Sequence, residues 1–202
     1  MDIYQHDEFL RKKGLRIAGI DEAGRGPIAG PVVASAVVLP RSLRIKGLRD
    51  SKKVPEKERE FLYKEISGSA EDIGIGIVGP EQIDNLNILR ATKLAMKLAV
   101  EDLSTTPDIL VIDAVSLSLI KIKQISIIKG ETKSASIAAA SIIAKYTRDQ
   151  IMIDYHRQYP NYNFGKNKGY STREHLEMIR LYGPCPIHRK SFHRVMTLEL
   201  PF

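Results

Sequence analysis

Two short apolar runs, each followed by an acidic residue, constrain the fold of this chain most strongly. Residues 15–20 lead into Asp21 and a glycine-rich turn, and residues 109–112 lead into Asp113. Apolar runs of this length, bounded by charge and glycine, are typical of buried strands. If the two strands lie side by side and parallel, their carboxylates meet at one edge of a sheet.

Three further segments have strand patterns. Residues 31–39 are rich in β-branched side chains, whereas residues 72–78 and 120–128 alternate, the former with its glycines on one face. Helical patterns cover residues 56–66, 87–103 and 133 to about 155, and a capping box at Ser171 and Glu174 opens a last helix that ends at about residue 182. Strands interspersed with helices predict an α/β or α+β sheet with helices packed on it.

The domain organisation follows from length and from the lack of a linker. A chain of 202 residues is long enough for one domain with a substantial core. The last third is mostly helical, and nothing that resembles a linker precedes it. We therefore expect one catalytic domain, residues 1–202, in which a sheet unit of about residues 1–157 carries a helical and irregular appendage of about residues 158–202.

Charge and composition narrow the classes of protein to consider. The net charge of +7 suits a polyanionic partner such as nucleic acid. Cys185 is the only cysteine, which excludes an intramolecular disulfide and a zinc site of paired thiolates and favours a reducing compartment. There is no signal-peptide pattern, and the longest weakly charged stretch, residues 135–144, is too short to cross a bilayer. These features predict a soluble, cytoplasmic protein.

The segment GIDEAGRGP, residues 19–27, indicates metal chemistry. Asp21 and Glu22 are adjacent, and adjacent strand residues point to opposite faces. Both can serve one metal centre only if the strand ends here, or if one acts through its backbone or a bridging water. Close carboxylates repel unless a cation neutralises them, and clusters of oxygen donors suit Mg²⁺ or Mn²⁺ rather than zinc. The alternative for an Asp-Glu pair at a strand end is a solvated turn.

A competing motif overlaps this segment. Gly24, Gly26 and Ala29 formally match a dinucleotide-binding fingerprint. That motif must open a helix whose N-terminus holds a pyrophosphate, but a proline and a β-rich run follow here. Asp21 and Glu22 would also repel phosphate unless metal intervened. A dinucleotide-dependent oxidoreductase is therefore disfavoured.

Nine segments, in order along nearly the whole chain, resemble the ribonuclease HII family of type 2 ribonucleases H. They are GIDEAGRGPIAGPVVASAVVL (19–39), LRDSKKV (48–54), IDNLNILRATKLAM (83–96), VIDAV (111–115), KGE (129–131), ASIIAKYTRD (140–149), YP (159–160), NKGYST (167–172) and PIHRKSF (186–192). The resemblance implies an α/β, ribonuclease H-like fold with a mixed central β-sheet flanked by helices and a helical C-terminal region.

The same resemblance implies an activity. Family members are endoribonucleases that hydrolyse the RNA strand of RNA–DNA hybrids and cut 5′ to single ribonucleotides embedded in duplex DNA, leaving 3′-hydroxyl and 5′-phosphate ends. They require Mg²⁺ or Mn²⁺, with two ions expected when substrate is bound, and they serve ribonucleotide and RNA primer removal. The alternative is a non-catalytic duplex-binding module on the same fold, which would be expected to have lost its carboxylates.

The resemblance assigns the metal-binding and catalytic side chains. Asp21, Glu22 and Asp113 match the family's first three metal carboxylates. Glu131 stands where the family often has aspartate, and the extra methylene still allows it to reach a metal or its water. Asp149 is the other candidate for the fourth carboxylate, but a surface ion pair with Lys145 at i−4 also explains it.

Substrate contacts are implied in the same way. The family's ribonucleotide-contacting turn matches residues 24–26, and its sugar-stacking tyrosine matches Tyr170. The full set of expected contacts comprises Gly24, Arg25, Gly26, Ser51, Lys52, Lys145, Lys168, Tyr170, His188 and Arg189. The basic members would position the nucleic-acid backbone without reading bases, and affinity would then fall with added salt.

Structural alternatives exist for several of these residues. The glycines can simply build a tight turn, and the loop at Ser51 can be solvated. Tyr170 can act as a hydrophobic staple on the following helix, although its partner would be His175, a poor apolar contact. His188 and His193 lack a third nitrogen or sulfur ligand, so neither is assigned to zinc. No clamp-binding glutamine motif is evident, and we expect a monomer.

Overall fold

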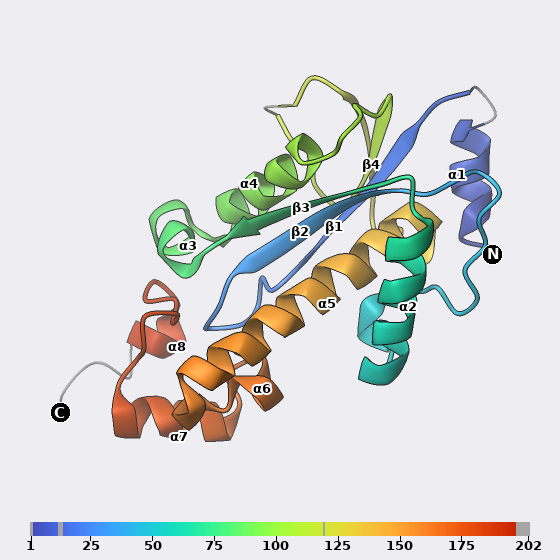
Figure 1. Cartoon of the computed structure of the whole chain (residues 1–202). Coiled ribbons are helices and arrows are strands. Elements are labelled where there is room, and N and C mark those ends of the chain that lie inside the picture. The colour runs from blue at the N-terminus through green and yellow to red at the C-terminus, as the bar shows by residue number, and fades with distance from the viewer. Residues whose placement is uncertain (1, 12–13, 119, 197–202) are drawn as a thin grey trace.

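The computed structural model describes residues 2–11, 14–118 and 120–196, and a five-stranded mixed sheet lies at its centre (Figure 1). The strands are β1 (Ile17–Ala23), β2 (Val32–Val38), β3 (Asp72–Val78), β4 (Ile109–Asp113) and β5 (Lys123–Ile127), in the order β3-β2-β1-β4-β5. The β1–β2 and β2–β3 pairs are antiparallel, whereas β4 pairs in parallel with both β1 and β5. The sheet is therefore mixed, as the resemblance implied.

Helices cover both faces of the sheet. They are α1 (Tyr4–Arg11), α2 (Glu56–Ser69), α3 (Pro80–Leu86), α4 (Ile88–Glu101), α5 (Ala135–Gln158), α6 (Phe164–Asn167), α7 (Arg173–Tyr182) and α8 (His193–Met196), with 3₁₀ turns η1 (Ser51–Lys53), η2 (Gly130–Thr132) and η3 (Pro160–Tyr162). Helix α4 packs on one face, and α5 with α2 packs on the other (Figure 1). None of the helices described is both long and apolar enough to span a membrane.

The alternation of strand side chains sorts the core into two layers. Ala18 and Ile20 of β1 pack with α4, whereas Ile17 packs with Ile137 of α5. Strand β2 is buried along its whole length because both faces are covered. Its one polar side chain, Ser35, donates a hydrogen bond of 2.9 Å to the carbonyl of Ala140 in α5, which satisfies the hydroxyl.

Glycines allow the helices to approach the sheet closely. A Cβ at Gly19 of β1 would lie 2.1 Å from the carbonyl carbon of Ser136 in α5. A Cβ at Gly76 of β3 would lie 1.9 Å from the carbonyl oxygen of Ala95 in α4. The glycine face of residues 72–78 is therefore the face on which α4 packs.

The C-terminal region is built around the far half of α5. This helix starts under the sheet and continues past it, and α6, α7 and α8 gather at its distal end, away from α1 (Figure 1). Phe164, Met152 and Ile187 belong to the apolar cluster of this region. Helix α5 contributes to both parts, and the division into a sheet unit and an appendage within one domain stays a prediction.

Several expected boundaries are wrong. Strand β1 does not end at Asp21 but continues to Ala23, because Glu22 and Ala23 pair with β2. The strand expected at residues 120–128 is shorter, spanning Lys123–Ile127, and residue 119 lies outside the described residues. Helix α7, expected to open with a capping box at Ser171, is capped instead by Thr172, whose hydroxyl accepts from the amide of His175. Glu174 accepts from Asn163 and does not close a capping box. Helices α1, α3, α6 and α8 were not predicted.

We predict that Gly19→Ala lowers the free energy of unfolding by about 3 kcal/mol or more, because the new methyl group has no space between β1 and α5. Gly68→Ala is the matched control: Gly68 is exposed in α2, a Cβ there meets nothing within 4 Å, and alanine favours helix by about 0.5–1 kcal/mol. Urea denaturation followed by circular dichroism measures both. Equal stability of the two variants would contradict the close packing.

Candidate active site

Parallel pairing places Asp21 beside Asp113. Ile20 lies opposite Ile112 in the β1–β4 register, and each aspartate follows directly in its strand. Asp21 has the parity of Ile17, and Asp113 that of Val111, so both side chains leave the sheet on the α5 face. Glu22 has the opposite parity and leaves β1 on the α4 side. Asp21 and Glu22 therefore lie on opposite faces of the sheet, near the end of β1.

Glu131 joins this group through a turn. The amide of Gly130 donates a hydrogen bond of 2.9 Å to Oδ1 of Asp113, which holds η2 against the end of β4. The Lys52 ammonium interacts electrostatically with Asp21, Glu22 and Glu131. Four carboxylates predicted from three separate segments are thus gathered at one end of β1 and β4.

The backbone next to two of these acids is strained. Ala114, directly after Asp113, has φ of 53°, and Lys129, two residues before Glu131, has φ of 55°. Residues other than glycine rarely adopt this left-handed conformation. The Ala114 amide donates to the carbonyl of Ile127 at 3.2 Å, so neighbouring strand β5 helps to hold the conformation. Strain of this kind is common at functional sites.

Burial and mutual repulsion raise the pKa of two of the acids. The pKa of Asp21 lies well above its usual value, first because of burial and then because of the neighbouring charges of Glu22 and Asp113. Burial also raises the pKa of Glu22, although Arg25, whose Nη1 lies 3.1 Å from Oε1, opposes the rise. Without a cation, the site thus holds negative charge at a free-energy cost.

An open groove of about 490 Å³ begins at Glu22. Its lining includes most of the expected substrate contacts, namely Gly24, Arg25, Gly26, Ser51, Lys52, Lys145 and Tyr170. They come from the loop after β1, from η1, from α5 and from the segment before α7. Of the remaining expected contacts, Lys168 does not line the groove, and its Nζ bonds to the carbonyl of Gly165.

Two fully buried arginines hold the loop after β1. Arg189 donates to the carbonyls of Gly24 at 2.6 Å, Pro27 at 2.7 Å and Gly30 at 2.9 Å. Arg148 of α5 donates to the carbonyls of Ala29 and Pro31 in the same loop and to that of Lys168. Arg148 and Arg189 therefore hold the loop after β1 in one conformation before any substrate binds.

These contacts correct two expectations. Arg189 is fully buried and His188 is 1% exposed, so neither side chain offers a surface to a phosphate in this structure. Arg189 instead supports the loop, whereas the His188 ring bonds to Cys185 and His175. Arg148 was missed altogether, although one signal was present: an arginine among the alanines and isoleucines of a buried helix must find acceptors inside the protein.

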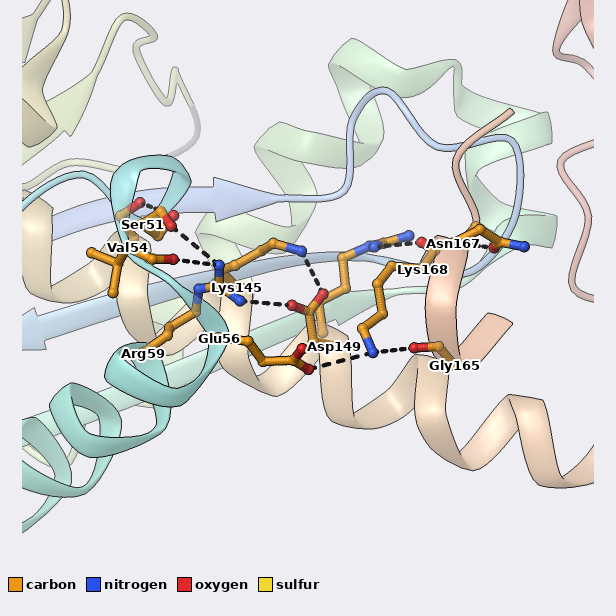
Figure 2. A network of polar contacts seen from close by, with 12 residues as sticks. Ser51, Val54, Glu56, Arg59, Lys145, Asp149, Gly165, Asn167 and Lys168 are labelled. Carbon is orange, nitrogen blue, oxygen red and sulfur yellow. Dashed lines mark hydrogen bonds and ion pairs between the residues drawn. The ribbon is translucent and has the colours of Figure 1, made fainter. Parts of the chain in front are cut away.

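A second polar network joins η1 to α5 (Figure 2). Asp149 accepts from Nζ of Lys145 at 2.5 Å and from Nη1 of Arg59 at 3.1 Å. The other terminal nitrogen of Arg59 donates to the carbonyls of Val54 at 2.8 Å and Ser51 at 3.4 Å. This arrangement holds Lys145 and the Ser51 loop, which both line the groove, against the same pair of side chains.

The network also bears on the choice between the two candidates for the fourth carboxylate. Asp149 is 4% exposed, so its pair with Lys145 is buried and not the surface pair that the sequence suggested. Both of its oxygens accept from cations of the protein. Oε2 of Glu131, by contrast, is buried without a hydrogen-bond partner. Geometry therefore favours Glu131 at the acidic cluster.

Tyr170 stands at the mouth of the groove with its ring 46% exposed. A Cβ at Gly26 would lie 3.8 Å from Cε1 of this ring, so the tyrosine stands beside the glycine turn. A hydrophobic staple would bury the ring on the following helix, and its exposure therefore contradicts that alternative. The side chain is free to contact a ligand in the groove.

Comparison with known proteins identifies the family. The family model for ribonuclease HII matches residues 18–195. This chain belongs to the ribonuclease HII family. It is 58% identical over 192 residues to ribonuclease HII of Acetivibrio thermocellus, covering 95% of this chain and 75% of the relative. It is 53% identical over 200 residues to the Bacillus subtilis enzyme, covering 98% and 78%.

Solved structures confirm the fold. The crystal structure of ribonuclease H2 from Pyrococcus horikoshii OT3 superposes with a TM-score of 0.76 at 29% identity, covering 92% of this chain and 97% of that one. Bst-RNase HIII in complex with Mn²⁺ has a TM-score of 0.72 at 21% identity, covering 91% and 69%, and shows the fold alone. The ribonuclease H-like α/β fold expected from the sequence is confirmed.

Membership of the family settles the broad activity. The chain is a ribonuclease H, an endoribonuclease that acts on RNA–DNA hybrids. The non-catalytic module and the dinucleotide oxidoreductase are both excluded. The module would have lost its carboxylates, whereas all four are present here, and a strand follows the glycine turn where a dinucleotide site needs a helix.

Enzymes of the ribonuclease H family use divalent metal ions, and the residues here fit such ions. Across residues 2–11, 14–118 and 120–196, no three His, Cys, Asp or Glu side chains lie close enough together to hold an ion as they stand. Three observations nevertheless support a fit: the unpartnered Oε2 of Glu131, the raised pKa of Asp21, and a donor set made only of oxygen. Asp21, Glu22, Asp113 and Glu131 would hold the ions.

We predict that Asp21→Asn raises the melting temperature of the metal-free protein by several degrees at pH 7.5. Because the pKa of Asp21 is raised in the folded state, its contribution to stability falls as pH rises from the usual aspartate range to the raised pKa, and stays low above it. The gain in the variant should therefore shrink as pH falls below the raised pKa. Differential scanning fluorimetry from pH 5 to 8 measures it.

The same variant tests metal binding without an activity assay. Mg²⁺ or Mn²⁺ should raise the melting temperature of the unmodified protein more than that of Asp21→Asn, because a ligand that binds only the folded state stabilises it. Asp154→Asn, a change of the same kind at an exposed position in α5, is the control. An equal response in all three proteins would remove Asp21 from the metal site.

Proposed function

We propose that this chain hydrolyses the RNA strand of RNA–DNA hybrids and also cuts 5′ to single ribonucleotides embedded in duplex DNA. The observation that carries the proposal is that four carboxylates from three segments come near one another beside a groove lined by a glycine turn, two lysines and an exposed tyrosine. Products would carry 3′-hydroxyl and 5′-phosphate ends, as the family resemblance implies.

The acids act by holding charge in place. Asp21, Glu22, Asp113 and Glu131 would bind two ions, Mg²⁺ or Mn²⁺, once substrate is present. Bound in this way, the ions supply the positive charge that favours in-line attack by water and departure of the 3′-oxygen. Arg25 and Lys52 offset part of the negative charge beforehand, since both lower the pKa of Glu22.

The glycine turn is the element best suited to recognise ribose. A ribonucleotide differs from a deoxynucleotide at one site only by its 2′-hydroxyl. Gly26 has no side chain, and apart from the Tyr170 ring nothing stands close to where its Cβ would be, so a sugar can approach the backbone here. Arg189 holds the carbonyls of Gly24 and Arg25, which keeps the turn rigid.

Lys52 and Lys145 would place the duplex along the groove. Both side chains line it, and lysine side chains bind phosphate as point charges. The pKa of Lys145 is lowered by burial, which Asp149 opposes, so the partner helps to keep the ammonium charged.

A PCNA complex is described for an RNase HII from Archaeoglobus fulgidus. For this chain, a monomeric state and a cytoplasmic location stay predictions.

We predict that Asp113→Asn lowers the rate of hybrid cleavage by at least about 100-fold, because it removes one charge from the acidic cluster without changing side-chain size. Affinity for the hybrid should change by less than about threefold, because binding rests on the groove and its lysines. Gel analysis of a labelled hybrid measures cleavage, and fluorescence anisotropy without divalent ions measures binding. Asp154→Asn serves again as the matched control, and full activity in Asp113→Asn would contradict the assignment.

We predict that Tyr170→Ala lowers kcat/KM at a single embedded ribonucleotide by about tenfold, which is within the range for loss of an aromatic stacking partner. The matched control is Tyr182→Ala, because Tyr182 is 57% exposed but does not line the groove. Steady-state cleavage of a DNA duplex with one ribonucleotide measures both. Unchanged kinetics in Tyr170→Ala would return the residue to a structural role.

A further inference from the structure

Two buried histidines lie outside the groove lining and have no part in the acidic cluster. His175 of α7 is 0% exposed and His188 is 1% exposed, and their Nε2 atoms lie 2.9 Å apart. Aromatic rings surround them: the Phe164 ring lies 5.3 Å from that of His175, and the Tyr162 ring lies 5.0 Å from that of His188. Burial lowers the pKa of both, that of His188 to about 4, so both are neutral at pH 7.

The hydrogen bonds at the two ends assign the tautomer of each ring. The backbone amide of Cys185 donates to Nδ1 of His188 at 2.9 Å. An amide can only donate, so this nitrogen carries no proton, and a neutral ring must then carry its proton on Nε2. The carbonyl of Cys185 also lies 3.2 Å from the same nitrogen, but the shorter amide contact decides the assignment.

The second ring completes a one-way chain. Nε2 of His188 donates to Nε2 of His175, so His175 carries its proton on Nδ1. That nitrogen lies 2.9 Å from the backbone carbonyl of Tyr170, which can only accept. Reasoning from either end gives the same result: amide of Cys185 to His188, His188 to His175, and His175 to Tyr170.

This series of hydrogen bonds ends at the segment that carries the exposed tyrosine, Tyr170. The Tyr170 carbonyl also accepts from the amide of Thr172 at 2.8 Å, and its amide donates to the carbonyl of Asn167 at 2.9 Å. Its ring, in contrast, stands free at the groove. The direction of the ring therefore depends on how firmly the backbone of this residue is held.

The other end of the chain lies next to the support of the glycine turn. His188 directly precedes Arg189, whose guanidinium holds the carbonyls of Gly24, Arg25 and Pro27. The amide of Ile28 donates to the carbonyl of Gly169 at 2.9 Å, which joins the two segments again. The histidine pair thus links the tyrosine to the glycine turn beside it.

We propose that His175 and His188 are positioning residues that hold Tyr170 and the glycine turn in the relative placement needed at an embedded ribonucleotide. The inference rests on the proposed function of Tyr170 in substrate binding. His175 acts through the Tyr170 carbonyl, and His188 acts by keeping the Nδ1 proton on His175. Neither ring touches substrate.

Two substitutions at one position separate positioning from packing. In His175→Asn the amide nitrogen lies near the place of Nδ1 and can still donate to the Tyr170 carbonyl. In His175→Gln the amide lies near the place of Nε2, which keeps the contact with His188 but leaves the Tyr170 carbonyl without this donor. We expect kcat/KM on a duplex with one ribonucleotide to stay within about threefold in the first and to fall about tenfold in the second.

The Tyr170→Ala background shows whether the effect passes through the tyrosine. His175→Gln should cause no further loss there, because two changes on one route are not additive. Equal losses in the Asn and Gln variants, or a full additional loss in the Tyr170→Ala background, would overturn the positioning role. If Tyr170→Ala alone matches the unmodified enzyme, the role of Tyr170 fails and this inference with it, while cleavage by the unmodified enzyme still stands.

If the variants do not fold, a measurement on the unmodified protein still tests the proposed tautomers. Long-range ¹H–¹⁵N correlation spectra distinguish the two neutral tautomers of histidine from the charged ring. The expected result at pH 7 is one buried ring protonated on Nδ1, assigned to His175, and one protonated on Nε2, assigned to His188. The same tautomer in both rings, or a charged ring, would be incompatible with this series of hydrogen bonds and would overturn the proposal.

Discussion

The parallel pairing of β1 with β4 is the constraint on which the rest of the site depends. It brings Asp21 and Asp113 together on one face of the sheet, where burial and like charge raise the pKa of Asp21. Such an arrangement is unfavourable by itself, so the rest of the fold must hold it. Helices on both faces of the sheet supply that support, with glycines at the closest approaches.

Buried cations organise the groove next to these acids. Burial lowers the pKa of Arg148 to about 10 and that of Arg189 to about 9, so both remain charged at neutral pH. Burying a charge costs free energy unless hydrogen bonds replace water, and here backbone carbonyls of one loop supply the acceptors. The cost is offset only when the loop has one conformation, which makes the glycine turn rigid before substrate arrives.

Much of the fold could be predicted from residue patterns because those patterns are local. The five strands of the sheet were predicted from apolar runs, β-branched residues and alternation, and the alternation of residues 72–78 matches β3 at both ends. Of the four longest helices, only α4 was predicted from apolar periodicity, whereas α2, α5 and α7 were predicted from a charged segment after a proline, from alanine-rich composition and from a capping signal. Boundaries failed where pairing decided them, as at Glu22, which stays in β1 because β2 continues beside it. Helices α1 and α3 span only eight and seven residues, so the local pattern is short and their positions depend on tertiary contacts.

For the site, residue chemistry together with family resemblance named the acids and most of the groove. What could not be predicted was which charged groups face inward. The sequence suggested a surface pair of Asp149 with Lys145, but in the structure Arg59 of α2 also pairs with Asp149. Arg189 was expected to bind phosphate but donates to the loop after β1, and His188 is buried against His175 and Tyr162. By itself the sequence determined the chemistry and the order of elements. Only the tertiary structure decided which polar groups became buried supports. The partners of Arg148 and Arg189 are backbone carbonyls that are far away along the chain and carry no residue-specific signal, and Arg59, the second partner of Asp149, comes from another helix.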